Sequence, residues 1–243
     1  MKNLNLFFAF ILVSGSVFSQ EWVPVLTEQW EPVPKIITPG NGSAPPSDAI
    51  VLFDGSSMDQ WENPDGGPAG WEVKDGIITV VKGNGEIQTK KGFGDVQLHI
   101  EWRTPAEVVG EGQGRGNSGV FLQQRYEVQV LDNYENITYP NGQAGSVYKQ
   151  HIPLVNACLP PGEWQTYDII YTAPRFNENG TLFSPAKLTV LHNGVLIQNH
   201  ISIKGPSEYI GQPPYEAHDI KQSLMLQEHS NPVSYRNIWL REL

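Results

Sequence analysis

The chain has 243 residues, of which 39% are hydrophobic and 10% aromatic, and its net charge is −10 at pH 7. That length suits one large domain or two small ones, and the aromatic side chains can supply a sizeable core. An acidic surface does not attract nucleic acids or anionic lipids, so we expect neither as a partner. Cys158 is the only cysteine, which excludes an intramolecular disulfide, and we interpret it as a small buried apolar residue.

The amino terminus has the pattern of a secretory signal peptide. Lys2 precedes an apolar run over residues 4–13, and the small residues Val17 and Ser19 follow at the spacing a signal peptidase needs. The run is too short for a stable membrane span. The pattern therefore predicts a leader over residues 1–19, export to the periplasm or the exterior of a bacterial cell, and no membrane insertion. Residues 20–47 are rich in proline and lack periodicity, which predicts an extended arm.

From residue 48 to residue 243 short strand-like runs alternate with Gly, Pro and Asn, as in an all-β domain. Asp75-Gly76 and Asn193-Gly194 are strong signals for hairpin turns. No segment has a sustained helical stripe of apolar residues, so the pattern predicts a two-sheet β-sandwich or jelly roll. The predicted strands, in chain order, cover residues 48–53, 71–73, 77–81, 96–103, 118–123, 126–131, 164–172, 186–192, 195–200, 224–227 and 234–241.

Three of these strands alternate apolar residues with hydrogen-bonding ones, so each has one apolar and one polar face. The polar faces are rich in Gln, His, Arg and Glu and poor in Lys, which favours a ligand groove, because such side chains bind hydroxyl groups directionally. A solvated outer face is the alternative. The polar positions are Gln97, His99, Glu101 and Arg103, then Arg125, Glu127 and Gln129, and finally Gln227 and His229.

Cleavage of a sugar bond usually needs two carboxyl groups. Glu127 and Asp132 are five residues apart and point to opposite faces of a regular strand, so they cooperate only if a bulge or the strand end turns Asp132 inward. Glu101 and Glu127 are the better pair, with His229 as a partner that titrates near neutral pH. Neutralisation of these carboxylates by Arg103 and Arg125 is the alternative interpretation.

Cofactor signals are weak. Six histidines are scattered without the spacing of a known metal motif, and the glycine-rich run over residues 110–116 lacks the helix and the Lys-Ser/Thr pair of a phosphate-binding loop. We therefore predict no cofactor and assign no metal ligands, while a structural or catalytic divalent cation stays open.

Several motifs occur in one order and together resemble the 3-keto-disaccharide hydrolase family over roughly residues 49–243. They include the sequences LFDG at 52–55, WEVKDG at 71–76, FGDVQLHIEWR at 93–103, GNSGV at 116–120, YEVQVLD at 126–132, PGEW at 161–164 and RNIW at 236–239. The resemblance implies a concanavalin A-like jelly roll whose concave sheet binds the ligand. It also implies cleavage of glycosides that carry a ketone at sugar carbon 3.

A ketone at carbon 3 acidifies the hydrogen at carbon 2, so a base can remove it, the aglycone can leave carbon 1, and water can then add. For this chemistry we predict Glu101 or Glu127 as the base, His229 as the acid and Arg103 as the donor to the oxyanion. The predicted substrate-binding residues are His99, Asn117, Arg125, Gln129, Gln227 and Asp132. An oxidoreductase that makes the ketosugar is the expected supplier of substrate.

Two other functions fit the same fold, because lectins and glucanases share it. A lectin-like, non-catalytic glycan-binding module would use an exposed aromatic platform, for which Trp61 and Tyr148 are candidates, although either can equally be a core residue. A hydrolase of unoxidised β-glucans is disfavoured, because the glucanase pattern E-x-D-x-x-E is absent.

Overall fold

A computed structural model of the chain describes residues 24–243. The predicted leader, residues 1–19, lies outside the described residues. The chain divides into two compact units, Met1–Ile36 and Ile37–Leu243. In the first unit the described residues form the 3₁₀ turn η1 (Pro24–Leu26) followed by a segment without regular structure. Residues 37–47 were predicted as part of the extended arm. They belong instead to the second unit, together with all the described strands.

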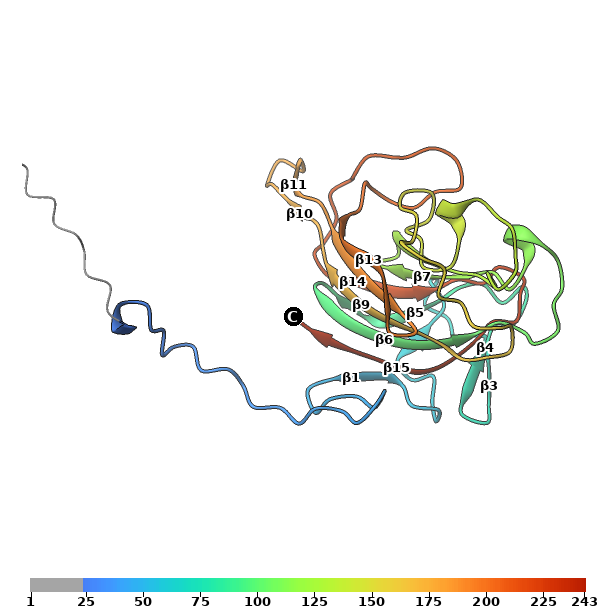
Figure 1. The fold of residues 1–243 in the computed structure, drawn as a ribbon, viewed down its shortest axis with the longest axis horizontal. Helices are drawn as coiled ribbons and strands as arrows, with labels where there is room; N and C mark the ends of the chain where they lie inside the picture. Colours follow the sequence, from blue (N-terminus) through green and yellow to red (C-terminus); the bar gives the residue numbers. More distant parts are fainter. Residues whose placement is uncertain (1–23) are drawn as a thin grey trace, which may run out of the picture. The chain divides into compact units, whose positions relative to one another are not determined.

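The second unit is a sandwich of two antiparallel sheets (Figure 1), which confirms the predicted all-β fold. The larger sheet contains, in spatial order, β13 (Val195–Ser202), β12 (Lys187–His192), β9 (Gln165–Thr172), β6 (Val96–Arg103), β15 (Ser234–Glu242), β4 (Ile77–Thr79) and β3 (Glu72–Lys74), with β1 (Ile50–Phe53) also paired to β15. The smaller sheet contains β2 (Trp61–Glu62), β5 (Ile87–Phe93), β14 (Gln222–Leu226), β7 (Ser118–Leu122) and β8 (Tyr126–Val130).

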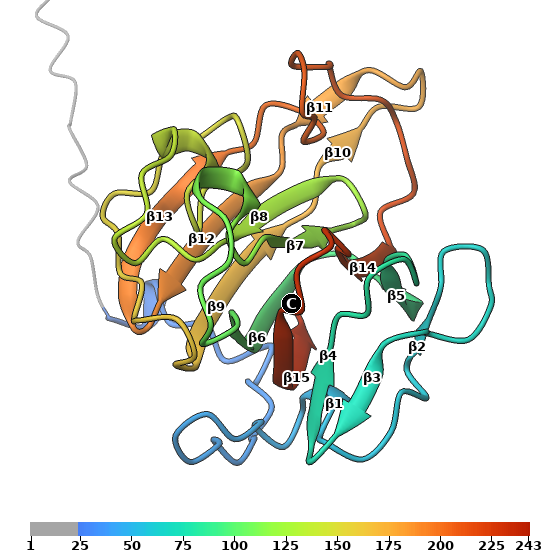
Figure 2. The same ribbon diagram turned by 90° about the vertical axis from the view of Figure 1, so that its right-hand side faces the viewer.

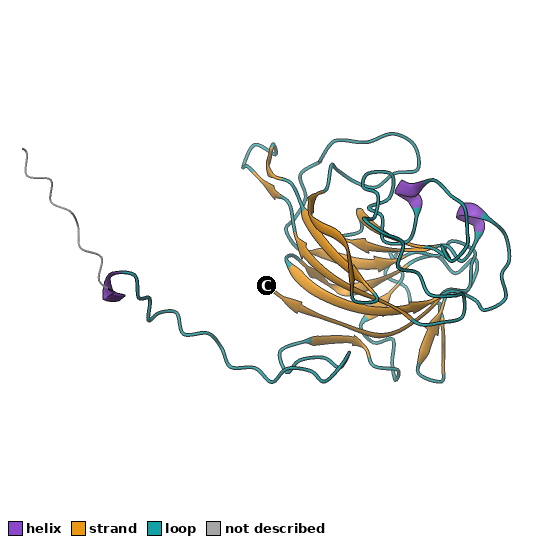
Figure 3. Ribbon diagram, in the orientation of Figure 1, coloured by secondary structure: helices purple, strands orange, loops and turns teal. Residues whose placement is uncertain are grey.

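The remaining elements lie in the connections. Two short strands, β10 (Arg175–Phe176) and β11 (Leu182–Ser184), form a separate hairpin. Two 3₁₀ turns, η2 (Gly112–Gly114) and η3 (Pro140–Gly142), belong to the loops beside the smaller sheet (Figure 3). Across that sheet, β8, β7, β14 and β5 follow one another (Figure 2), and β8 forms its edge.

The core lies between the sheets, as the alternation in the sequence predicts. The apolar residues of β6, from Val96 to Trp102, are at most 3% exposed, and so are Tyr126, Val128 and Val130 of β8. The ring of Tyr126 contacts the ring of Tyr171 from the larger sheet, with centroids 6.1 Å apart. Burial of these side chains is the main favourable contribution to folding.

Three buried tyrosines of the larger sheet donate hydrogen bonds to β7, to β8 or to the turn between them. Tyr167 donates to the carbonyl oxygen of Gln129 at 2.8 Å, and Tyr235 donates to Ser118 Oγ at 2.6 Å. Tyr171 donates to Gln123 Oε1 at 2.8 Å. A buried hydroxyl without a partner is costly, so these bonds fix how the sheets face each other and hold β7 and β8 in place.

Both predicted hairpin turns are confirmed. Asp75 and Gly76 join β3 to β4, and Asn193 and Gly194 join β12 to β13, with positive φ at all four residues. Such turns need positive φ at both central positions, which Asn, Asp and Gly tolerate best. The sequence did not predict β5, because Lys90-Lys91-Gly92 interrupts its alternation. Within residues 24–243 no helix is long and apolar enough to cross a membrane.

Trp61 is fully buried and Cys158 is partly buried. Trp61 is 2% exposed and donates its Nε1 hydrogen to the carbonyl oxygen of Leu52, so it is a core residue and not a platform for sugars. Cys158 is half-buried, and burial raises the pKa of its thiol to about 12. A thiol with so high a pKa is a poor nucleophile at neutral pH.

Candidate functional site

A pocket of about 430 Å³ opens on the outer face of the smaller sheet. Its floor carries Glu127 and Gln129 of β8, Phe121 of β7 and Met225 of β14. These residues share one face because the strands are in register: Phe121 lies opposite both Glu127 and Met225. Their neighbours in sequence, such as Val128, point the other way into the core. Strand alternation therefore places the polar side chains in the pocket.

Two loop segments build a wall along the edge of β8. Gln129 donates its backbone N–H to the carbonyl oxygen of Ser146, and Tyr148 donates its own to the carbonyl oxygen of Glu127. Farther along, Ser207 donates to the carbonyl oxygen of Arg125, and its Oγ accepts from the N–H of Glu127. These bonds satisfy the free backbone groups of an edge strand and bring both loops to the pocket.

A cluster of aromatic side chains forms the upper part of that wall. Tyr148 and Tyr209 line the pocket, and the hydroxyl of Tyr148 lies 2.7 Å from that of Tyr139. The ammonium group of Lys149 lies 4.7 Å from the ring centroid of Tyr139 and 4.9 Å from that of Tyr209. These cation–π contacts link the two loops of the wall through one lysine.

Glu127 is the most perturbed acid in the pocket. It is 5% exposed, and burial raises the pKa of its carboxyl group to about 8. Among residues 24–243, no Lys, Arg or His forms an ion pair with it. Removal of a carboxylate from water without a compensating charge favours the protonated form. Glu127 is thus poised to bind and release a proton near neutral pH, as a catalytic base or acid must.

Hydrogen bonds from the η2 loop fix the orientation of two pocket amides. Gln113 Nε2 donates to Thr138 Oγ1 and to the carbonyl oxygen of Gly142, which leaves Gln113 Oε1 as an acceptor. Gln129 Nε2 donates to that oxygen at 3.0 Å. In the same way Asn117 Nδ2 donates to the carbonyl oxygen of Gln113. Because the nitrogen atoms are used in these bonds, both amides retain oxygen atoms as acceptors for a ligand.

The floor of the pocket is consequently rich in acceptors. Within the described part of the chain, Gln129 Oε1 and Gln227 Oε1 are buried and have no hydrogen-bond partner. They lie on either side of Gly119, since Gln129 is opposite this glycine in β8 and the backbone N–H of Gln227 donates to its carbonyl oxygen. Buried acceptors without partners are unusual, and hydroxyl groups of a ligand are the donors that would satisfy them.

Five of the ten residues predicted from the sequence line this pocket. They are Asn117, Glu127, Gln129, Gln227 and His229. Tyr148, a candidate aromatic platform, lines it as well. Sequence reasoning missed Ser207 and Tyr209, because they lie in a loop without periodicity, and Gln113, because its effect depends on contacts distant in sequence.

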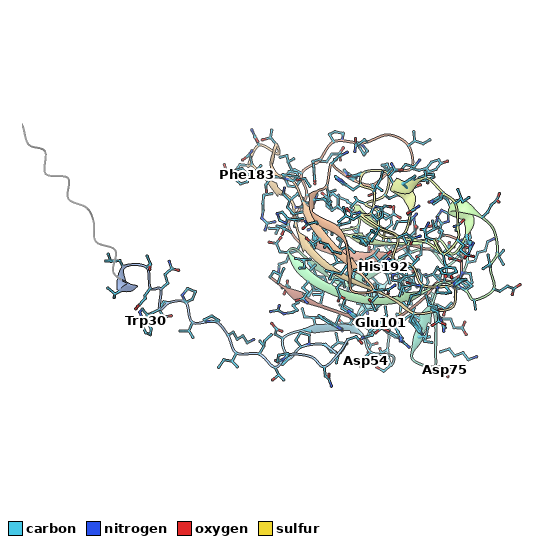
Figure 4. All side chains as sticks on the ribbon, in the orientation of Figure 1. Trp30, Asp54, Asp75, Glu101, Phe183 and His192 are labelled. Atoms are coloured by element: carbon cyan, nitrogen blue, oxygen red, sulfur yellow. The ribbon has the colours of Figure 1, made fainter. Side chains whose placement is uncertain are left out.

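Glu101, Arg103 and His99 are not brought together with Glu127. They lie on β6 in the larger sheet, whereas β8 belongs to the smaller one, so their outward faces look away from each other across the core. Figure 4 labels Glu101 among the strands of the larger sheet. The predicted pairing of Glu101 with Glu127 is therefore wrong: strand alternation gives the side of a strand on which a residue lies, but not the sheet that the strand joins.

The surroundings of Glu101 and Arg103 are those of structural residues. Glu101 accepts hydrogen bonds from Arg236 Nε at 2.6 Å and Asn237 Nδ2 at 2.9 Å. Burial opposes ionisation of Glu101, but these two bonds and the charge of Arg236 outweigh it and hold the pKa of the carboxyl below its usual value. The guanidinium of Arg103 lies 4.6 Å from the ring centroid of Trp164.

Asp132 and Arg125 also lie outside the pocket. Asp132 is 3% exposed and forms an ion pair with Arg115, with 2.6 Å between Oδ2 and Nε. Its other oxygen accepts from the backbone N–H of Tyr134, so both oxygens have structural partners. Arg125 lies in the turn between β7 and β8 and donates to the carbonyl oxygen of Gln123. Among residues 24–243, no group of three or more His, Cys, Asp or Glu side chains is placed to hold a metal ion.

Comparisons with known proteins point to carbohydrate chemistry. The family model described as the 3-keto-alpha-glucoside-1,2-lyase-like domain matches residues 48–241. A protein of Parabacteroides distasonis, named provisionally as a glycosyl hydrolase, is 52% identical, with a TM-score of 0.87 over 91% of this chain and 97% of its own. A second from that organism, also so named, is 20% identical, with a TM-score of 0.58 over 81% and 94%, and shows the fold alone. The curated proteins gave no match. Together the family and the first relative support a glycoside hydrolase-like enzyme.

Proposed function

The chain belongs to the 3-keto-alpha-glucoside-1,2-lyase-like family, and on this basis we propose that it cleaves glycosides whose sugar carries a ketone at carbon 3. The observation that carries the proposal is Glu127, a buried carboxyl group whose pKa is raised to about 8. It faces a pocket in which amide oxygens can accept hydrogen bonds from hydroxyl groups of a ligand. Abstraction of the acidified hydrogen at carbon 2 needs a base of this kind.

The proposed reaction has two balanced steps. In the first, the base takes the proton from carbon 2, the electron pair forms the bond between carbons 1 and 2 through an enolate, and the aglycone leaves carbon 1 with a proton from an acid. In the second, the hydroxyl of water adds to carbon 1 and a proton returns to carbon 2. Neither step changes the oxidation level of the sugar overall, so the route needs no redox cofactor.

The pocket residues divide into three roles. Glu127 is the base, and His229, which is exposed at the pocket, protonates the leaving aglycone. Tyr148 replaces Arg103 as the proposed donor to the enolate oxygen, because it lines the pocket and Arg103 does not. Asn117, Gln129 and Gln227 accept hydrogen bonds from sugar hydroxyls.

The oxidation that makes the substrate is a separate reaction. A ketone at carbon 3 arises by removal of hydride from a secondary alcohol, so a sugar oxidoreductase must precede this enzyme. We further propose that the protein acts after export to the periplasm or the cell exterior, on the basis of the leader pattern in residues 1–19.

A 3-keto-α-glucoside with a chromogenic aglycone tests the proposal directly. Release of the aglycone is expected from this compound and not from its unoxidised parent. Deuterium at carbon 2 is expected to slow release, and ¹⁸O from labelled water is expected at carbon 1 of the product. Release from the unoxidised parent at an equal rate would overturn the 3-keto specificity.

A lectin-like function is the alternative, and Tyr209, which is 70% exposed and lines the pocket, favours it. Exposed aromatic rings of this kind stack on sugars. The same assay separates the two functions, because a lectin would bind the ketosugar without releasing the aglycone. Burial of an acid lowers the stability of the fold, and a binding module gains nothing from the raised pKa that results. The buried acid therefore favours the enzyme.

A further inference from the structure

A second hollow, of about 500 Å³, lies on the outer face of the larger sheet, on the other side of the sandwich from the pocket with Glu127. Residues 37–46 form one wall, and strands β6, β9 and β15 form the floor. This hollow contains polar residues that sequence analysis singled out and that the proposed reaction does not use, among them Gln97 and His99.

The wall is fixed to the floor by hydrogen bonds. The carbonyl oxygen of Ser43 accepts from Asn237 Nδ2 at 2.9 Å and from Trp239 Nε1 at 3.0 Å. At the end of the segment, the carboxylate of Asp48 accepts from the guanidinium of Arg241, with Oδ2 2.8 Å from Nη2. These bonds hold the wall over β15, so the hollow is part of the folded structure.

The floor is a stacked pair of rings buttressed by a carboxylate. The rings of His99 and Trp239 lie 5.2 Å apart at an angle of 17°. His99 is 4% exposed, and its Nδ1 lies 2.7 Å from Asp168 Oδ1. Its Nε2 is buried and has no hydrogen-bond partner within residues 24–243, the nearest carboxylate oxygen being Glu101 Oε1 at 3.7 Å. A buried nitrogen without a hydrogen-bond partner is unusual, and a ligand or a water molecule would satisfy it.

The hollow also offers groups with hydrogen-bonding capacity to spare. Asp168 is 41% exposed at its side chain and uses only Oδ1 for His99, so Oδ2 is an acceptor. Gln97 accepts from Arg241 through Oε1, so its Nε2 is a donor. Thr166 adds a hydroxyl from β9. One acceptor, one donor and one hydroxyl thus lie at the same face of the sheet.

These groups favour an uncharged ligand with both polar and apolar surfaces. The charge of Arg241 is compensated by Asp48, and Asp168 would repel an anion, so phosphate and sulfate groups are disfavoured. Opposite the polar floor the wall presents Ile37 and Pro39. A sugar ring has this division, with hydroxyl groups at its edge and C–H groups on its faces. We propose that this hollow is a second, non-catalytic binding site for a neutral saccharide.

The site goes beyond the proposed function and does not depend on it, because binding there requires no ketone and no turnover. Two sites on opposite faces would allow the protein to remain on a glycan through the larger sheet while the pocket with Glu127 stays open for the reacting sugar. Affinity for such a glycan would then raise the local concentration of substrate without any change in the chemical step.

Binding of maltose and cellobiose to the full chain, measured by saturation-transfer NMR and calorimetry, tests the proposal. We expect at least one disaccharide to bind the wild type and the Glu127→Gln variant alike. Asp168→Asn, which keeps an oxygen for His99 but replaces the free acceptor by a donor, and Gln97→Ala are each expected to weaken binding about five- to tenfold. Circular dichroism shows whether each variant is folded, and Thr166→Val serves as a third variant if one is not.

Two results would overturn the proposal. One is the absence of binding of either disaccharide to the wild type at tens of millimolar. The other is loss of binding in Glu127→Gln or Gln129→Ala together with unchanged binding in the three variants of the larger sheet. The sugar would then occupy only the pocket on the smaller sheet. Failure of the 3-keto assay alone would leave the second site untouched, so the two proposals fail separately.

Discussion

The carboxylate of Glu127 lies against Gly119 of the neighbouring strand, so closely that a Cβ atom at residue 119 would come within 2.7 Å of Glu127 Oε1. The same Cβ would lie 2.8 Å from a ring carbon of Phe121. Gly119 does not have a positive φ, so its role here is close approach and not backbone conformation. The absence of a side chain at this position makes the space in which the proposed base lies.

Gly119→Ala is therefore expected to damage the site more than the fold. The new methyl group displaces the Glu127 carboxylate, and a shift of about 1 Å in a catalytic group can cost roughly 100-fold in rate. We expect kcat/KM for the 3-keto-glucoside to fall by about that factor. Gly114→Ala is the matched control, because no atom lies within 4 Å of a Cβ there. Equal activity of both variants would mean that the position of the carboxylate does not matter.

The raised pKa of Glu127 predicts the pH dependence of catalysis. A base must be deprotonated to act, so kcat/KM is expected to rise with pH and to level off above about 8, the pKa that burial gives this group. The acidic limb of the pH profile of kcat/KM measures this pKa. A limb near the ordinary value of 4.5 would show that Glu127 is not the base, or that bound groups compensate its charge.

The same shift predicts how stability changes with pH. Between pH 4.5 and about 8 the folded protein holds the Glu127 proton that the unfolded chain has released. Folding therefore becomes less favourable as pH rises through this range, and the loss is complete above about 8. Urea unfolding at pH 5 and pH 9 measures the change. The free energy of unfolding is expected to fall more between these pH values for the wild type than for Glu127→Gln, which cannot ionise. An equal fall in the free energy of unfolding of the two proteins would contradict the raised pKa of Glu127.

The sequence predicted the polar face of each strand correctly but not the site as a whole. Alternation placed both Glu101 and Glu127 away from the core, as the structure has them. The sheet that each strand joins depends on pairings distant in sequence, such as β6 with β9 and β7 with β14, and no local pattern gives these. Tyr209 escaped prediction for a related reason: its place depends on backbone bonds from a loop to the edge of β8.

Gln113 is expected to act on catalysis through other residues. It orients Gln129 and Asn117, so Gln113→Leu frees both amides to turn and lose their hydrogen bonds to the sugar. We expect KM to rise about tenfold with a smaller change in kcat, because these contacts bind the hydroxyls of the ground state as well as those of the transition state. Steady-state kinetics measure the two constants. An unchanged KM would show that the acceptors do not contact the substrate.

Tyr148→Phe tests the proposed donor to the enolate. Loss of one such donor commonly lowers kcat by about 100-fold or more, while the aromatic ring stays in the pocket and KM is expected to change little. Tyr139→Phe is the comparison variant, because its hydroxyl contacts Tyr148 and does not line the pocket. We expect kcat to fall less in Tyr139→Phe than in Tyr148→Phe. A Tyr148→Phe enzyme with full kcat would assign the enolate to another donor.

Isosteric replacement of the two carboxylates separates catalysis from structure. Glu127→Gln is expected to lower kcat/KM by a factor of about 10² to 10⁴, since the proposed base is removed. Glu101→Gln is expected to leave kcat/KM nearly unchanged but to lower the free energy of unfolding by about 1–2 kcal/mol, because Arg236 and Asn237 lose a charged partner. Release of the aglycone and urea unfolding measure the two effects. A folded Glu101→Gln variant without activity would move the reaction to the larger sheet.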